Sequence, residues 1–254
     1  MKIVVCVKQV PDLQSDRSMA GGRLVRGEDD VLNELDEYAV EAAVALAESL
    51  GGTVTAVTMG PSDADDALRR ALQVGADDAL HVADDALAGA DVGVTARVLA
   101  AAVRHLEEGG PIDLVVTGMA TMDSLTSMLP DALAAALGLP ALTLAAEVEC
   151  DGTRARITRT IGDHTEVLSA PLPLLLSVTD QANEPRIPNF AAMKAARRRT
   201  VRTVGLAELG LDDVRPATAV LTAVPRPPRA PGTIISATGD GGARLAAFLR
   251  ERLA

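Results

Sequence analysis

The chain has 254 residues, of which 48% are hydrophobic, and it carries a formal net charge of -11. This length suits one large α/β domain, or a domain with a long appendage. The acidic balance argues against nucleic acid and against an anionic membrane surface as partners, because both require a positive protein surface. Aromatic residues make up only 1% of the chain, so we expect a core of aliphatic side chains.

Cysteine and histidine are too sparse for a disulfide framework or a metal site. The two cysteines, Cys6 and Cys150, form no CxxC pair, and the three histidines show no metal-ligand spacing. No apolar stretch reaches the length needed to span a bilayer, so we expect no membrane insertion. The short apolar run at residues 3–7 is typical of a buried strand rather than of a signal peptide. These features favour a reduced, cytoplasmic protein.

Up to about residue 140, apolar strands alternate with amphipathic helices. Ser62 is expected to cap the second helix, and glycines end several of the others. The alternation indicates a doubly wound, mostly parallel sheet of the Rossmann-like class. The elements predicted in chain order are a strand at 2–8, a loop at 11–27, a helix at 36–50, a strand at 53–58, a helix at 62–75, a strand at 79–82, a helix at 91–108, a strand at 113–117 and a helix at 124–137.

After this region the helices stop. Segments 141–149, 153–160, 165–169 and 172–178 have strand patterns, and Asp151-Gly152 is typical of a hairpin turn. We therefore expect an added β hairpin region, antiparallel or mixed, in the same sheet.

The remaining chain is rich in proline, which is typical of an extended C-terminal arm rather than of a domain. A short amphipathic helix at 242–253 could pack on its own domain or on a partner. The expected organisation is a domain at residues 1–200 and an arm at 201–254.

The sequence GMATMDSLTSML, which follows the strand at 113–117, is the best candidate ligand loop. No GxGxxG, GxxxxGK[ST], GxSxG or HExxH motif is present, but doubly wound folds bind ligands at the carboxyl ends of their strands. Gly118 would let a ligand approach the backbone, and Asp123 would cap the next helix or contact a ribose. A phosphate would suit the hydroxyl and N–H groups at the expected helix start, at Ser124, Thr126 and Ser127. A capped loop without any ligand explains the same residues equally well.

The segment NEPRIPNFAAMKAARRR, residues 183–199, combines a phenylalanine with two prolines and a basic run. Pro185 and Pro188 restrict the backbone, so a loop presenting Phe190 would lose little entropy on binding a protein partner. Positive charges beside it would steer an acidic partner. Alternatively, Phe190 packs in the local core and the charges are only solvated. The basic residues are Arg186, Lys194, Arg197, Arg198 and Arg199.

This segment resembles the signature of the electron transfer flavoprotein β subunit. The resemblance extends through VVCVKQVPD, LNELDEYAVEAA, ALQVGADDALHV and DLVVTGMATMDSLTSMLPDALAAALGLP, in that family's order and spacing. It implies an adenine-nucleotide-binding α/β fold and a heterodimer whose α subunit holds most of an FAD site. In most members the β subunit binds a structural AMP, and in electron-bifurcating members it binds a second FAD.

The resemblance also implies site residues. Phe190 would be the hydrophobic anchor for flavin-dependent dehydrogenases of the acyl-CoA type, and residues 10–13 would contact FAD. Leu125 and Met128 stand where many members have Asp and Gln, and Thr160 stands where an acidic residue is usual. The residues implied for AMP are Cys6, Asn33, Glu34, Leu35, Asp36, Met59, Gly118, Met119, Ala120, Thr121, Met122, Asp123, Ser124, Leu125, Thr126, Ser127, Met128 and Leu129. Those implied for docking are Glu184, Pro185, Arg186, Ile187, Pro188, Phe190 and Lys194.

The function implied is that of an electron carrier subunit. It would accept electrons from dehydrogenases and pass them to a downstream acceptor, without catalytic residues of its own. Two alternatives remain open, namely the bifurcating subtype with FAD in this subunit and a stand-alone nucleotide-binding protein of the universal stress type. An enzyme that hydrolyses or makes nucleotides would need a catalytic base or a metal cluster, and the sequence offers neither.

Overall fold

The structure is a computed structural model that describes residues 1–27, 29–224, 226–236 and 239–253. The chain divides into two units, Met1–Leu221 and Thr222–Ala254. The first unit therefore continues beyond the boundary expected after residue 200. The reason is that residues 201–204 add a strand to the main sheet, and Leu206 and Val214 are buried in the same core.

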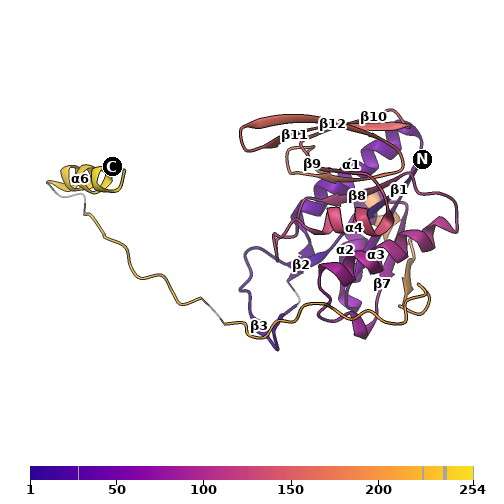
Figure 1. Ribbon diagram of the computed structural model, residues 1–254, viewed down its shortest axis with the longest axis horizontal. Coiled ribbons are helices and arrows are strands. Elements are labelled where there is room, and N and C mark those ends of the chain that lie inside the picture. The colour runs from indigo at the N-terminus through magenta and orange to yellow at the C-terminus, as the bar shows by residue number, and fades with distance from the viewer. Residues whose placement is uncertain (28, 225, 237–238, 254) are drawn as a thin grey trace. The chain divides into compact units, whose positions relative to one another are not determined.

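A seven-stranded parallel sheet forms the centre of the first unit, with β1 in the middle (Figure 1). The continuous apolar runs of these strands suit a sheet that is buried on both faces. A doubly wound α/β fold is thus confirmed. In spatial order the strands are β14 (Val201–Val204), β7 (Asp78–Val82), β6 (Thr53–Met59), β1 (Lys2–Cys6), β8 (Leu114–Gly118), β13 (Leu174–Val178) and β9 (Ala141–Ala145).

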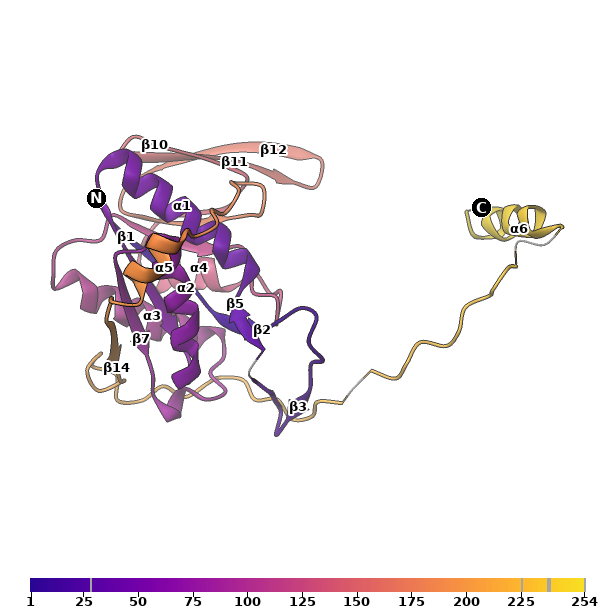
Figure 2. The ribbon, with the colours of Figure 1, turned by 180° about the vertical axis from the view of Figure 1, so that it is seen from behind.

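Helices cover both faces of this sheet. Figure 2 shows α1 (Glu34–Leu50), α2 (Asp65–Val74) and α5 (Phe190–Ala196) on one face. Figure 1 shows α3 (Val92–Glu107) and α4 (Leu129–Leu137) on the other. Each face has its own buried cluster, built almost entirely from Ala, Val, Leu and Ile. The aliphatic core that the composition predicts is therefore present as two layers.

Local signals explain several helix ends. Gly51 ends α1 in the left-handed region, with φ of 71°, and its N–H donates to the Ala47 carbonyl. Asp91 caps α3 by accepting a hydrogen bond from the Val94 N–H at 2.9 Å. Ser62 is no such cap, because it lies inside a 3-10 turn, Ser62–Ala64, that precedes α2.

Three strands form a separate antiparallel sheet, β10 (Glu147–Cys150), β11 (Arg154–Ile161) and β12 (His164–Pro171). The expectation that the whole β addition joins the main sheet is therefore wrong for these strands and correct for β9 and β13. The expected strand at 141–149 is split, because Leu144 has φ of 61° and the Ala146 N–H donates to Thr158 on β11. The predicted hairpin turn is present, and the Asp151 carboxylate accepts the Arg154 N–H at 2.9 Å.

The long loop after β1 is more ordered than its polar sequence suggests. It contains two short antiparallel pairs, β2 (Gln9–Pro11) with β5 (Asp30–Leu32) and β3 (Met19–Ala20) with β4 (Arg23–Leu24). These pairs turn the loop back along the carboxyl edge of the main sheet, where its arginines become part of the candidate site.

The second unit begins as an extended chain and ends in α6 (Gly241–Leu253), close to the bounds expected for an amphipathic helix. Within α6, the Arg252 guanidinium lies 5.1 Å from the centre of the Phe248 ring. Among all described residues, no helix combines the length and apolar character needed to cross a bilayer.

Candidate nucleotide and docking sites

The candidate ligand site lies where the strand order reverses. The chain runs from β1 outward to β6 and β7 and then returns to β8, on the other side of β1. Ligands of doubly wound sheets bind at this point, outside the carboxyl ends of the strands. The segment after β1, the first turn of α1 and the loop of residues 119–128 meet there. That loop, called here the β8–α4 loop, contains most of the site residues predicted from the sequence.

Asn33 joins these three segments. Its side chain is fully buried, donates from Nδ2 to the Ala120 carbonyl at 2.9 Å and accepts from the Met122 N–H at 2.9 Å. Its own backbone N–H donates to the Lys8 carbonyl at 2.8 Å. One amide side chain therefore fixes the first half of the β8–α4 loop against the start of α1.

Asp36, one turn along α1, is also buried and accepts the Lys8 N–H at 2.8 Å. Burial raises the pKa of this carboxyl to about 7, although hydrogen bonds from Asn33 and Lys8 oppose the shift. Burial, with a smaller effect from Asp36, also raises the pKa of the Cys6 thiol to about 12. Cys6 is therefore a neutral core residue rather than a nucleophile.

Gly118 has a packing role that the sequence did not predict. A Cβ at this position would lie 2.5 Å from the Asp36 carboxylate and 2.6 Å from the Leu35 carbonyl. The glycine thus lets α1 pack closely on β8, and the approach of a ligand is not needed to explain it.

Asp123 lies at the centre of a small ion-pair group. Its carboxylate is 2.8 Å from the Lys8 ammonium and 3.4 Å from the Arg26 guanidinium, which also donates to the Gln9 carbonyl at 2.6 Å. Burial alone would raise the pKa of Asp123, but the neighbouring positive charges outweigh it and hold that pKa below its ordinary value. Asp123 caps no helix, so that expectation is wrong. It holds two cations at the edge of the site.

The helix after β8 begins at Leu129, five residues later than the expected start at 124. Ser124 and its neighbours therefore lie in the β8–α4 loop, where the Ser124 and Thr121 hydroxyls are 2.8 Å apart. Leu125 and Ser127 both have φ of 52°, a strained conformation that is unusual outside glycine and common at ligand sites.

Unused hydrogen-bonding groups remain at this edge of the sheet. Within the described part of the chain, the N–H groups of residues 126–128 donate no hydrogen bond. The Thr117 hydroxyl, near the end of β8, is buried and has no partner among the described residues. Buried hydroxyl groups are normally satisfied. Free N–H donors, an orphaned hydroxyl and the nearby Lys8 and Arg26 fit a phosphorylated ligand such as a nucleotide.

The expected nucleotide residues thus differ in placement. Cys6 and Asp36 are buried and Leu35 is half-buried, whereas Glu34, Leu125 and Met128 are exposed. Met59 ends β6, the strand next to β1, and packs against the second core cluster.

Sequence reasoning missed Lys8, Arg26 and Arg17, whose guanidinium donates to the Met122 carbonyl at 2.8 Å. The polar loop that carries both arginines gives no sequence signal for where its side chains lie. Of the residues expected to contact FAD, Val10 is buried and Leu13 is exposed, and Thr160 is exposed near the tip of the β11–β12 hairpin.

Residues 183–199, called here the docking segment, run along α1 and then form α5. Phe190 is 77% exposed and Ile187 is 91% exposed, which disfavours the alternative in which Phe190 packs in the local core. Glu184 and Lys194 are exposed as well. Arg186 behaves differently from the other basic residues, because its guanidinium is paired with Glu41 and Glu48 of α1. The expectation that it adds free positive charge beside Phe190 is therefore wrong.

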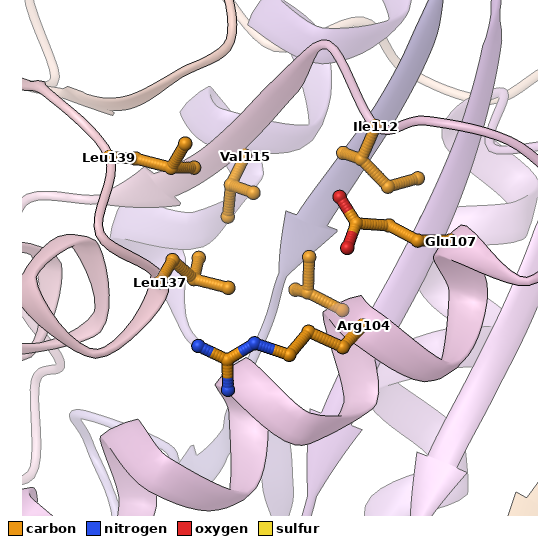
Figure 3. A pocket seen from close by; sticks show the side chains of 7 residues that line it. Arg104, Glu107, Ile112, Val115, Leu137 and Leu139 are labelled. Atoms are coloured by element: carbon orange, nitrogen blue, oxygen red, sulfur yellow. The ribbon is translucent and has the colours of Figure 1, made fainter.

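Two hollows lie at the opposite, amino edge of the sheet. Figure 3 shows the smaller, of about 50 Å³, between α3, α4 and β8, with Arg104 and Glu107 at its rim. It has room for one or two water molecules rather than for a nucleotide. A wider hollow of about 600 Å³ is lined by residues that include Lys2, Asp78 and Arg202. Neither lies near the β8–α4 loop.

The fold and the site together define a doubly wound α/β protein with a nucleotide-type site at its switch point. A family model described as electron transfer flavoprotein domain matches residues 22–209. The chain is 36% identical to the electron transfer flavoprotein subunit beta of Mycobacterium leprae over 260 residues, which cover 97% of each chain. It belongs to the electron transfer flavoprotein β-subunit family.

Two further relatives support this family assignment. The electron transfer flavoprotein subunit beta of Megasphaera elsdenii is 30% identical over 264 residues, covering 100% of this chain and 98% of the relative. The protein FixA of Azorhizobium caulinodans is 37% identical over 221 residues, covering 84% of this chain and 78% of the relative. The family is one of flavoprotein electron carriers, so the stand-alone stress-protein alternative is not retained.

Proposed function

We propose that this chain is the β subunit of a heterodimeric electron transfer flavoprotein and that it binds AMP at the β8–α4 loop. FAD, bound mainly by the α subunit, supplies the redox chemistry. This chain supplies no bond-making group. It provides the structural nucleotide site, part of the subunit interface and the surface on which dehydrogenases dock before electrons pass to a downstream acceptor.

The nucleotide assignment depends on two features at the carboxyl edge of the sheet. The Asn33 side chain fixes the β8–α4 loop, and the same loop has backbone N–H groups that donate no hydrogen bond within the described residues. Asn33 holds the first half of the β8–α4 loop rigid, while the second half leaves unused N–H groups. Lys8 and Arg26 offset the Asp123 charge and would favour a phosphate nearby. A rigid backbone with unpaired donors is the arrangement that binds phosphate in many nucleotide sites.

The docking assignment is supported by the exposure of Phe190 and Ile187. A large apolar side chain on a fixed backbone binds a partner with little loss of entropy. The exposed Lys194 and the basic residues after it would favour encounter with an acidic dehydrogenase surface. We infer that the dehydrogenases are of the acyl-CoA type.

The deciding experiment is mass spectrometry of the nucleotides released from the purified αβ complex. One AMP and one FAD per complex support the proposal, and two FAD indicate the bifurcating subtype. Absence of a second nucleotide would refute the site assignment. Asn33→Ala should lower the AMP content, whereas Phe190→Ala, which changes only the docking segment, should leave it unchanged.

A further inference from the structure

One arginine fastens the docking segment to α1. The Arg186 guanidinium binds the Glu41 carboxylate through Nε at 2.8 Å and Nη2 at 2.9 Å. It binds the Glu48 carboxylate through Nη1 at 2.7 Å and Nη2 at 3.0 Å. The Arg186 backbone N–H adds a bond to Glu41 at 3.1 Å. Two bidentate pairs on one guanidinium fix its orientation as a single charged contact would not.

The ion pair between Arg186 and Glu41 differs from an ordinary surface ion pair, because Glu41 is largely shielded from solvent. The Glu41 side chain is only 11% exposed, so its charge has little solvent to stabilise it and depends on Arg186. Hydrogen bonds from Arg186 lower the pKa of Glu48, and the two carboxylates raise the pKa of Arg186. Glu48 and Arg186 therefore both stay charged over the ordinary pH range.

The contact lies between two other fixed points of the segment. Upstream, Asn183 donates from Nδ2 to the Tyr38 carbonyl of α1 at 2.9 Å. Downstream, Asn189 caps α5 by accepting the Ala192 N–H at 2.9 Å, and Ala196 is buried in the core cluster beside α2. Between these points no helix or strand holds the backbone, so Arg186 fixes the stretch that carries Ile187.

We propose that Arg186 is a positioning residue for dehydrogenase docking. It touches α1 rather than the partner, and it holds Ile187 and Phe190 outward before the partner arrives. This inference rests on the proposed docking function. Ordering the segment in advance lowers the entropy cost of binding, so loss of the Arg186 contacts should weaken docking without altering the redox centre.

The experiment compares two variants of the αβ complex. The first carries Arg186→Gln, and the second carries Glu41→Ala and Glu48→Ala together. The second variant keeps the arginine charge but removes both acceptors. Electron transfer is measured from a purified acyl-CoA dehydrogenase that reduces the wild-type complex. Both variants should raise KM about tenfold, the ratio expected for about 1.4 kcal/mol of lost preorganisation, while kcat and the flavin absorption spectrum stay unchanged.

Arg156→Gln is the matched control. Arg156 forms an exposed ion pair with Glu149 on the antiparallel sheet, so this variant removes one arginine charge without touching the docking segment. Its KM should equal that of the wild type. Amide hydrogen exchange in peptides covering residues 183–196 should rise in the Arg186→Gln variant and in the Glu41→Ala, Glu48→Ala variant, and not in the control. This second readout reports the loosened segment even where a variant has lowered stability.

The outcomes separate this inference from the docking function itself. A raised KM for Arg186→Gln alone would mean that Arg186 touches the dehydrogenase, and would overturn the positioning role. An unchanged KM in Arg186→Gln and in the Glu41→Ala, Glu48→Ala variant, with a raised KM for Phe190→Ala, would overturn the positioning role and leave the docking function intact. Unchanged KM in all three would refute the docking assignment and the inference with it.

Discussion

The Asn33 side chain binds the backbone of Met122 and thereby joins the start of the first long helix to the loop that follows β8. The same amide also binds the Ala120 carbonyl. Asn33 itself is fully buried.

Asn33→Ala should therefore destabilise the protein. It leaves the buried Ala120 carbonyl and the partly buried Met122 N–H without partners, and we expect a loss of about 2–3 kcal/mol in the free energy of unfolding. Denaturant unfolding monitored by circular dichroism measures this loss. Asn189→Ala removes an exposed helix cap instead and should cost only about 1 kcal/mol. Equal losses in the free energy of unfolding for the two variants would contradict the role given to the Asn33 hydrogen bonds.

Gly118→Ala should disrupt the packing of α1 on β8. The added Cβ would meet the Leu35 carbonyl, which is backbone and cannot rotate away, so we expect a loss of about 1–3 kcal/mol in stability. Gly93→Ala, in the first turn of α3, meets only ordinary contacts and should be neutral or slightly stabilising. Thermal unfolding of the two variants provides the comparison, and a neutral Gly118→Ala would show that α1 does not approach β8 this closely.

Phe190→Ala should impair electron transfer and leave stability unchanged. The ring is exposed, so its removal costs little in folding, whereas an aromatic anchor in an interface is commonly worth about 2 kcal/mol, or about 30-fold in affinity. Steady-state reduction by an acyl-CoA dehydrogenase should show a raised KM at constant melting temperature. Val167→Ala, which shortens an exposed apolar side chain on β12, serves as the control. A wild-type KM for Phe190→Ala would refute the anchor role.

Asp36 should give the stability a distinct dependence on pH. Its pKa is raised to about 7 in the folded state, above the ordinary value of 3.8, so between these values the folded protein binds more protons than the unfolded chain. The contribution of Asp36 to stability is therefore greatest below about pH 4, falls as pH rises towards 7 and is constant above it.

Asp36→Asn removes this titration. Unfolding free energies measured from pH 5 to 8 should fall more steeply with pH for the wild type than for Asp36→Asn. Parallel curves for the two proteins would show that the Asp36 carboxyl is not shifted upward.

The main sheet could be predicted because its signals are local. The apolar run Ile3 to Val7 and the run ending at Gly118 mark buried parallel strands, and glycines such as Gly51 and Gly138 mark helix ends. The break of the expected strand after Ala145 could not be predicted, because it depends on the positive φ of Leu144 and on the hydrogen bond that the Ala146 N–H donates to Thr158 of β11.

The chemistry of the site was less predictable, since it depends on contacts between distant residues. Asp123 is 115 positions from Lys8, and Arg186 is 145 positions from Glu41. Nothing in either local sequence indicates that these charges are paired. A resemblance between motifs places residues at a site, but only the fold shows that Gly118 accommodates a helix and that Arg186 pairs with Glu41 and Glu48 of α1.

Tyr38 is the single tyrosine of the chain, which also lacks tryptophan. It lies on α1 between Asp36 at the nucleotide edge and Glu41 of the Arg186 contact, and its carbonyl binds Asn183. Fluorotyrosine incorporated into this subunit alone would thus give one ¹⁹F resonance from the complex. Tyr38 lies between the nucleotide edge and the docking segment, so one ¹⁹F spectrum could report a structural change at either of these two surfaces.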